Sequence, residues 1–266
     1  MPVSRSLRFI LVIAPLALGA CRTAFVPTRF QSNTALYEAS LRELNARHWG
    51  NAVAGFERLT IELPARDTLF PLALWHLGRA HQGRREWLLA AQSFTRLAET
   101  FSADTLADEA LVEAGMSYGR MWRKPSLDSE YGETAMATLE TMLTLFPNSP
   151  HVPRAQREVD RLREWFGRKD LVNAMHYFRR KAYDSAIIYF NDVIQEYPTT
   201  AAARAAMLRL AESYRKINYR EELAETCSTL RERYPADGEV REQCGTVPRT
   251  ANSADTTRTD TARTTP

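Results

Sequence analysis

The sequence predicts an all-α fold, a solenoid of about five helical hairpins that stack one after another. Three observations support this prediction. Five segments repeat one spacing of apolar residues, a helix-stopping proline or serine follows each segment, and a second helical pattern with a small residue at a fixed place precedes them.

The repeated spacing belongs to the second helix of each hairpin. Steps of four, three and four residues place the apolar side chains of a segment on one helical face. In the first segment these are Ala52, Phe56, Leu59 and Leu63, and Pro64 then stops the helix. Successive segments end 38, 45, 51 and 37 residues apart, which suits hairpin repeats with insertions. The five segments are 52–63, 90–101, 135–146, 186–197 and 223–234.

The first helix of a hairpin carries a small residue where its partner helix must approach closely. Gly78 and Gly115 hold this place in the second and third repeats, and Ala174 and Ala211 hold it in the fourth and fifth. Alanines such as Ala52 supply the matching small face on the second helix. Fixed offsets of this kind resemble the tetratricopeptide repeat, which implies a tetratricopeptide-repeat solenoid. Aromatic residues expected to cover the hairpin turns are Trp49, Trp87 and Tyr183.

Two segments depart from the plain repeat. Residues 123–133 contain Pro125 and Gly132 and predict a loop inserted between the two helices of the third repeat. Residues 153–166 keep a helical apolar spacing and predict a helix that continues into the first helix of the fourth repeat, with a bend at Gly167.

The N-terminus has the pattern of an export signal. Residues 1–20 combine two arginines, a short apolar run and small residues before Cys21, as in a secretory signal peptide. The run is shorter than the ~20 residues that a membrane-spanning helix needs. Leu18-Gly19-Ala20-Cys21 resembles a bacterial lipobox, which implies cleavage before Cys21 and acylation of its thiol. The alternative is an ordinary secreted protein in which this cysteine is incidental.

The repeats are flanked by two segments of different composition. Residues 21–33 have no clear period and are expected to tether the repeat domain, residues 34–240, to the lipid. Residues 241–266 are rich in threonine and are expected to be disordered, because they offer little apolar surface to bury.

Charge and cysteine content narrow the class of protein. Without residues 1–20 the formal charge falls from +3 to +1, so the chain has no general attraction to nucleic acid. Cys227 and Cys244 are 17 residues apart. In an oxidising compartment they could form a disulfide, and a buried residue plus a free thiol is the alternative.

No pattern of catalytic residues stands out. The histidines do not have the spacing of a helical zinc site, and neither a glycine-rich phosphate loop nor a Gly-x-Ser-x-Gly motif occurs. The sequence therefore predicts a protein that is not an enzyme and that uses no cofactor and no metal.

Arrays of this kind bind partners on a concave surface lined by the first helix of each hairpin. Arginines on such a surface fit the carboxylate of an extended peptide, and aromatic residues fit its apolar side chains. For Leu41 and Val112 the alternative to peptide contact is a place in the core between repeats. The candidate groove residues are Tyr37, Leu41, Trp75, Arg79, Gln82, Val112, Met116 and Arg120.

The stretch 139–200 resembles the BamD family of outer-membrane β-barrel assembly lipoproteins. It contains Phe146-Pro147-Asn148-Ser149-Pro150, the segment 174–186 and Tyr197-Pro198-Thr199-Thr200. The family has two tyrosines where this chain has Tyr177-Phe178. The resemblance covers about residues 21–240. Arg22 differs from the aspartate that retains some lipoproteins in the inner membrane, which favours the outer membrane.

The resemblance implies a non-enzymatic, lipid-anchored scaffold on the periplasmic face of the outer membrane. Its implied partners are unfolded outer-membrane proteins, the central subunit of the β-barrel assembly machinery and the membrane. The family assigns substrates to the N-terminal repeats and the central subunit to the C-terminal ones, here around 183–197 and 219–234. The alternative is a lipid-anchored adaptor for cell-envelope or peptidoglycan factors.

Overall fold

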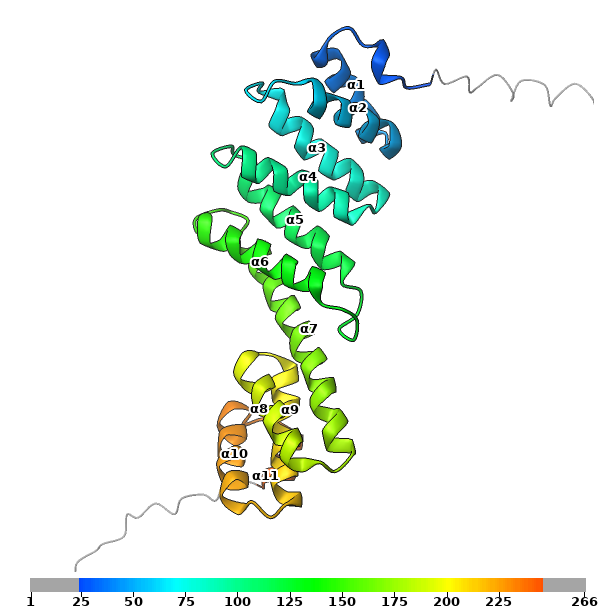
Figure 1. The fold of residues 1–266 in the computed structure, drawn as a ribbon. Helices are drawn as coiled ribbons and strands as arrows, with labels where there is room; N and C mark the ends of the chain where they lie inside the picture. The colour runs from blue at the N-terminus through cyan, green and yellow to red at the C-terminus, as the bar shows by residue number, and fades with distance from the viewer. Residues whose placement is uncertain (1–23, 246–266) are drawn as a thin grey trace, which may run out of the picture. The chain divides into compact units, whose positions relative to one another are not determined.

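The computed structural model describes residues 24–245, and these fold almost entirely into helices. Within this range there are eleven α-helices, one short 3₁₀-helix and no β-strand (Figure 1), as the apolar spacing predicted. The hairpins are α1 (Asn33–Asn45) with α2 (Trp49–Glu62), α3 (Leu69–Arg84) with α4 (Trp87–Thr100), α5 (Ala107–Met121) with α6 (Glu130–Leu145), α7 (Val152–Arg179) with α8 (Tyr183–Glu196), and α9 (Ala201–Lys216) with α10 (Arg220–Arg233). The additional elements are η1 (Pro27–Arg29) and α11 (Gly238–Cys244).

Four of the hairpins share one turn. A single residue with positive φ, near +60°, ends the first helix at Arg47, Arg85, Lys181 and Asn218. The N–H of the next residue then donates to a carbonyl in the last turn of that helix, as from His48 to Glu43 at 2.9 Å. This is the Schellman arrangement, which satisfies carbonyls left free at a helix end. The α5–α6 connection is the exception, because the insertion lies there.

Both departures from the plain repeat were predicted, with a shift in one boundary. Residues 122–129 connect α5 and α6, so the loop ends four residues earlier than the expected position 133. Asp128 explains this start, because its carboxylate accepts the N–H of Glu130 at 3.0 Å. The long helix is confirmed as α7, which is continuous over 28 residues.

The helices belong to two compact units. Unit 1 comprises residues 24–121 and 137–153, and unit 2 comprises residues 122–136 and 154–245. Helices α1 to α5 pack in sequence order within unit 1. Helices α8 to α11 pack together within unit 2.

The core of unit 1 is built from the repeated apolar positions. Ala52, Phe56 and Leu59 have no solvent exposure, and the next repeat buries Ala90, Phe94 and Leu97 equally. The small residue of the first helix has the expected purpose at Gly78. A Cβ atom there would lie 2.6 Å from the Phe94 ring, so only glycine allows α3 to approach α4 this closely.

Unit 2 uses the same pattern and adds an aromatic cluster. Phe190 and Val193 of α8 are fully buried beside Ala174 of α7. Trp122 is 2% exposed, and its ring centre lies 4.6 Å from that of Phe166. The Tyr197 hydroxyl donates to Asp170 at 3.0 Å. Burial and the charge of Asp170 both raise the pKa of Tyr197. This bond fixes the end of α8 to α7.

The ends of the repeats differ from the sequence expectation. Residues 21–33 were expected to be a tether, yet Phe25 and Phe30 pack against the core of unit 1. The disordered tail was expected from residue 241, yet α11 extends to Cys244 and buries Val240. A disulfide joins Cys227 to Cys244, with Cα atoms 5.3 Å apart, which settles the alternatives that spacing left open.

Several predictions fall outside the range that the structure covers. The signal peptide, Cys21 and the tail from residue 246 onward lie outside the described residues. Between residues 24 and 245, no helix is both long and apolar enough to cross a bilayer.

Candidate functional site

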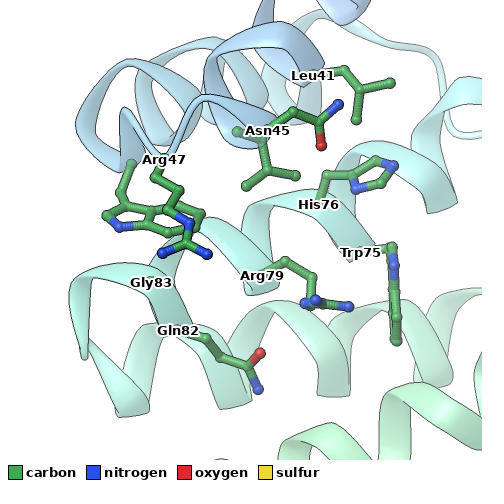
Figure 2. Close-up of a pocket in the computed structure, with 10 residues that line it drawn as sticks. Leu41, Asn45, Arg47, Trp75, His76, Arg79, Gln82 and Gly83 are labelled. Atoms are coloured by element: carbon green, nitrogen blue, oxygen red, sulfur yellow. The ribbon is translucent and has the colours of Figure 1, made fainter.

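Unit 1 contains a cleft of about 550 Å³ between α1 and α3. Figure 2 shows its labelled side chains, which come from α1, from the α1–α2 turn and from α3. Helices α1 and α3 are the first helices of their hairpins, and first helices were expected to line the surface that binds partners. The lining residues are Leu41, Leu44, Asn45, Arg47, Trp49, Trp75, His76, Arg79, Gln82 and Gly83.

The apolar part of the cleft is held rigidly. The Trp75 ring is 8% exposed and meets Phe94 edge-on, with ring centres 5.2 Å apart. Trp49 lies against Gly83, where a Cβ atom would collide with the indole. Because tryptophan loses little rotamer entropy in such a packed setting, this part of the cleft is preorganised for an apolar side chain.

The polar part of the cleft is cationic. The Arg79 guanidinium carbon lies 6.0 Å from the centre of the Trp75 ring, and the Arg79 side chain is exposed. Arg47 is exposed at the turn. Among the described residues that line the cleft, none is acidic. Two arginines in a cleft that also contains the Trp75 indole therefore favour a ligand that carries a carboxylate and an apolar side chain.

His76 is a neutral member of the cleft. Its ring stacks on Phe56 at 5.4 Å and lies 5.9 Å from the Tyr37 ring. Burial, with the Arg79 charge in second place, lowers the pKa of His76 to about 4. At neutral pH it therefore adds no positive charge and leaves recognition of anions to the arginines.

Gln82 is fixed by its own partners. Its side-chain amide donates to Glu113 at 2.6 Å and to Ser117 at 3.3 Å, both on α5. The Ser117 hydroxyl in turn donates to the backbone carbonyl of Glu113 at 2.7 Å. The Gln82 side chain therefore positions one wall of the cleft and has few donors left for a ligand.

The structure gathers some of the predicted groove residues and separates others. Leu41, Trp75, Arg79 and Gln82 line the cleft together. Tyr37 lies behind His76, half-buried, and burial raises its pKa. Two further predicted positions lie elsewhere on α5: Met116 is half-buried, and Arg120 sits 4.9 Å over the Trp87 ring.

The remaining groove candidate, Val112, is fully buried. Met116 and Arg120 do not line the cleft. They belong to α5, which packs against α4. Val112 belongs to the core, as its alternative interpretation stated.

Sequence reasoning missed several lining residues. Leu44 and Asn45 share the α1 face with Leu41 at steps of three and four, so helical spacing alone would have found them. His76 follows Trp75 directly, and only the tertiary structure shows that it lines the cleft. Arg47 owes its position to the turn. No group of three or more histidine, cysteine, aspartate or glutamate side chains that could hold a metal occurs within residues 24–245.

Comparison with known families gives one match over most of the chain. The model of the family YfiO, described as outer membrane lipoprotein, matches residues 30–230. The match includes both units and the cleft.

Two curated relatives are similar over comparable lengths. The outer membrane protein assembly factor BamD of Caulobacter vibrioides is 23% identical over 202 residues, which cover 76% of this chain and 66% of that protein. The BamD protein of Vibrio cholerae is 27% identical over 203 residues, 72% of this chain and 83% of that protein. The chain thus spans just under two thirds of the Caulobacter relative.

Solved structures give distant similarities in fold. The TPR domain of P58(IPK) aligns with 80% of this chain and 54% of its own, at 13% identity and a TM-score of 0.43. The TPR2AB domain of yeast Sti1 aligns with 80% of this chain and 81% of its own, at 12% identity and a TM-score of 0.43.

Proposed function

The chain belongs to the YfiO family of outer membrane lipoproteins, and from this premise we propose that it is a scaffold in the assembly of outer-membrane β-barrel proteins. The observation that carries the proposal is the family match over residues 30–230. Two relatives named as outer membrane protein assembly factors support it. The protein acts by binding, without catalysing a reaction.

The cleft in unit 1 receives an unfolded segment of the substrate. Arg47 and Arg79 pair with a carboxylate, either at a chain end or on an acidic side chain. Trp75 contributes the apolar floor beside them. An extended segment with one aromatic or aliphatic residue next to a carboxylate therefore fits the cleft best. A transported barrel protein presents such segments before it folds, since its strands alternate apolar and polar residues.

Unit 2 docks the central subunit of the assembly machinery. Its surface on α7 and α8 exposes large apolar side chains to solvent. Ile188 is 61% exposed and Tyr189 is 39% exposed, and the Tyr189 ring stacks on Tyr177 at 4.7 Å. Exposed aromatic side chains of this kind are enriched at protein interfaces.

A lipid anchor on Cys21 holds the protein on the periplasmic face of the outer membrane. Two or more acyl chains give stable attachment, because each buried CH₂ contributes about 0.8 kcal/mol. Metabolic labelling with palmitate tests the anchor. The chain should carry label, and Cys21→Ser should abolish it. An unlabelled wild-type chain would refute the anchor.

The assembly role is tested by purification and depletion. Affinity purification from detergent-solubilised membranes should recover a large outer-membrane barrel protein together with this chain. Depletion should lower the amount of folded barrel proteins in the membrane. Normal levels of folded barrel proteins after depletion would sink the proposal, and recovery of cell-wall enzymes alone would favour an envelope adaptor.

The cleft is tested separately, with a peptide of the chemistry described above. Arg79→Gln should weaken binding of a peptide that ends in an aromatic residue and a free carboxylate by about tenfold, the value of one charge-assisted hydrogen bond. Arg66→Gln is the matched control, because Arg66 is also exposed in unit 1 and does not line the cleft. Equal affinity of both variants would place the binding site elsewhere.

A further inference from the structure

The tip of the α3–α4 hairpin in unit 1 has an unusual surface. Leu88 and Leu89, in the first turn of α4, are 37% and 44% exposed. Arg84 and Arg85 are exposed at the turn, and Glu86 and Trp87 separate them from the leucines. Arg84 forms an ion pair with Glu86 at 2.9 Å, whereas Arg85, with positive φ, ends α3. Adjacent exposed leucines cost free energy in water, so a hairpin tip that keeps them beside two arginines calls for a partner that takes both.

Four exposed arginines lie at this edge of unit 1, Arg42 and Arg47 around the end of α1 and Arg84 and Arg85 around the end of α3, together with two glutamates, Glu43 and Glu86. Both first helices carry an arginine in their last turn, Arg42 in α1 and Arg84 in α3. The second helices α2 and α4 carry none there. Complementing the helix dipole would favour basic residues at every C-terminus. The dipole therefore does not explain why only the ends at the hairpin turns are basic.

The start of the described chain lies at the same edge. Ala24 and Phe25 line a shallow cavity of about 680 Å³ together with Trp49 at the start of α2 and Arg84 at the end of α3. Phe25 is held in place, since it packs against the unit 1 core and its ring centre lies 5.7 Å from that of Phe30. Cys21 precedes Ala24 by only three residues, a reach of about 11 Å. Acyl chains on Cys21 would therefore enter a membrane next to this edge.

We propose that the hairpin-turn edge of unit 1, defined by Arg47, Arg84, Arg85, Leu88 and Leu89, contacts the anionic lipid surface of the membrane that holds the anchor. This inference rests on the acylation of Cys21 in the proposed function. The leucines enter the headgroup boundary while the guanidinium groups bind lipid phosphates. Trp49, half-buried at the same edge, has the amphipathic ring that suits this boundary.

The contact would orient the cleft. Arg47 belongs to the edge, and Trp49 lines the cavity at the edge. Both residues also line the cleft. The cleft therefore opens close to the lipid surface, where an unfolded barrel segment would have to be delivered. The acyl chains attach the protein to the membrane, and a basic surface beside them adds a second contact that orients it.

The experiment removes the anchor and asks whether the edge still recognises lipid. The chain from residue 21 onward, carrying Cys21→Ser, is sedimented with vesicles of equal parts phosphatidylglycerol and phosphatidylcholine, and with vesicles of phosphatidylcholine alone. We expect binding to the anionic vesicles only, and loss of that binding in high salt. Failure to bind the anionic vesicles would overturn the proposal and would point to an acidic protein as the partner of this edge.

Variants then locate the contact. Arg84→Gln with Arg85→Gln should weaken binding about 25-fold, because each arginine near an anionic bilayer contributes about fivefold. Leu88→Gln with Leu89→Gln should also weaken it. The control is Arg179→Gln with Arg180→Gln, which removes the same charge from the exposed α7–α8 turn of unit 2. A control that loses as much binding as the unit 1 pair would overturn the proposal, and circular dichroism verifies that each variant is folded.

A depth measurement supports the assignment independently. A nitroxide on Leu89→Cys, in the Cys21→Ser chain, should become shielded from a water-soluble relaxation agent when anionic vesicles are added. A nitroxide on Ile188→Cys should stay accessible. Equal accessibility at both positions would count against the proposal. Palmitate labelling tests the anchor alone, and vesicle binding by the unacylated chain tests the edge alone. Failure of the anchor proposal is therefore distinguishable from failure of the edge proposal.

Discussion

Units 1 and 2 repeat one hairpin but fill the same turn with different chemistry. In unit 1, His48 contacts Glu43 at 2.9 Å, and the next hairpin reverses the pair, with His81 contacting Glu86 at 2.8 Å. At the corresponding turn of α9 and α10 in unit 2, Tyr214 stacks on Tyr219. The shared backbone turn tolerates a hydrogen-bonded histidine–glutamate pair or an aromatic pair. The repeat therefore fixes the path of the chain and leaves its polar surface free to specialise.

The outer ends of the two units are closed by different means. Phe25 and Phe30 cover unit 1 without any covalent link. Unit 2 is closed by α11, whose Val240 is buried and whose Cys244 forms a disulfide to α10. Arg231 also donates to the Cys244 carbonyl at 2.8 Å. Terminal repeats need such covers because their outer apolar faces have no neighbour.

The largest expected effect tests whether the two units depend on the same core position. Phe94→Ala in unit 1 and Phe190→Ala in unit 2 each remove a fully buried ring. Each should lower the free energy of unfolding by about 3–5 kcal/mol. Amide hydrogen exchange should show the loss of protection in α3 and α4 for the first variant and in α7 and α8 for the second. A loss below 1.5 kcal/mol for either one, about that of an Ile→Val change, would mean that its unit is not built around this ring.

The next effect addresses the covalent closure that only unit 2 has. Replacing Cys227 and Cys244 together by serine should lower the free energy of unfolding by about 3 kcal/mol, the value for a loop of this size. Reductant should reproduce the change in the wild-type chain. Exchange should rise in α10 and α11 and stay unchanged in α1 to α3. Unaltered stability of the double variant would show that α11 closes the unit without the disulfide.

A smaller effect separates the units by pH. His76 titrates at about 4 in folded unit 1 and near 6.5 when unfolded, so the unfolded chain binds more protons between these values. Stability that is present above pH 6.5 is therefore lost as the pH falls toward 4, by about 1 kcal/mol after allowing for partial exposure of the ring. Thermal unfolding of wild type and His76→Gln should converge on acidification, because only the wild type loses this contribution. Parallel pH curves would contradict the prediction.

The smallest effect concerns the turn that both units share. Glycine adopts positive φ without steric cost but loses more backbone entropy on folding, so Arg85→Gly in unit 1 and Lys181→Gly in unit 2 should each stabilise by only roughly 0.5 kcal/mol. Asn218→Gly should gain less, since asparagine already tolerates this conformation. Denaturant titrations measure all three. Destabilisation by Lys181→Gly would show that its side chain makes a contact more valuable than the strain it causes.

The sequence by itself determined the hairpins and their close contacts. Steps of four, three and four residues report which face of a helix is buried, and this is a local property that the chain carries at every repeat. Gly78 was identified in the same way, because a small residue recurs at one place in the first helix of each hairpin, and the structure shows that Phe94 is the neighbour this glycine accommodates. The length of α7 also followed from the helical spacing of residues 153–166, which predicted a helix that continues into the first helix of the fourth repeat.

Only the tertiary structure decided which residues meet across helices. Arg79 and Arg47 share a cleft, whereas Arg120 turns to Trp87, although helical spacing treats Arg79 and Arg120 alike. Packing of Phe25 against unit 1 and of α11 against α9 depends on surfaces that no single segment encodes. The physical reason is that periodicity fixes the direction of a side chain within its own helix. The partner it reaches depends on how helices dock, which is a sum over many contacts.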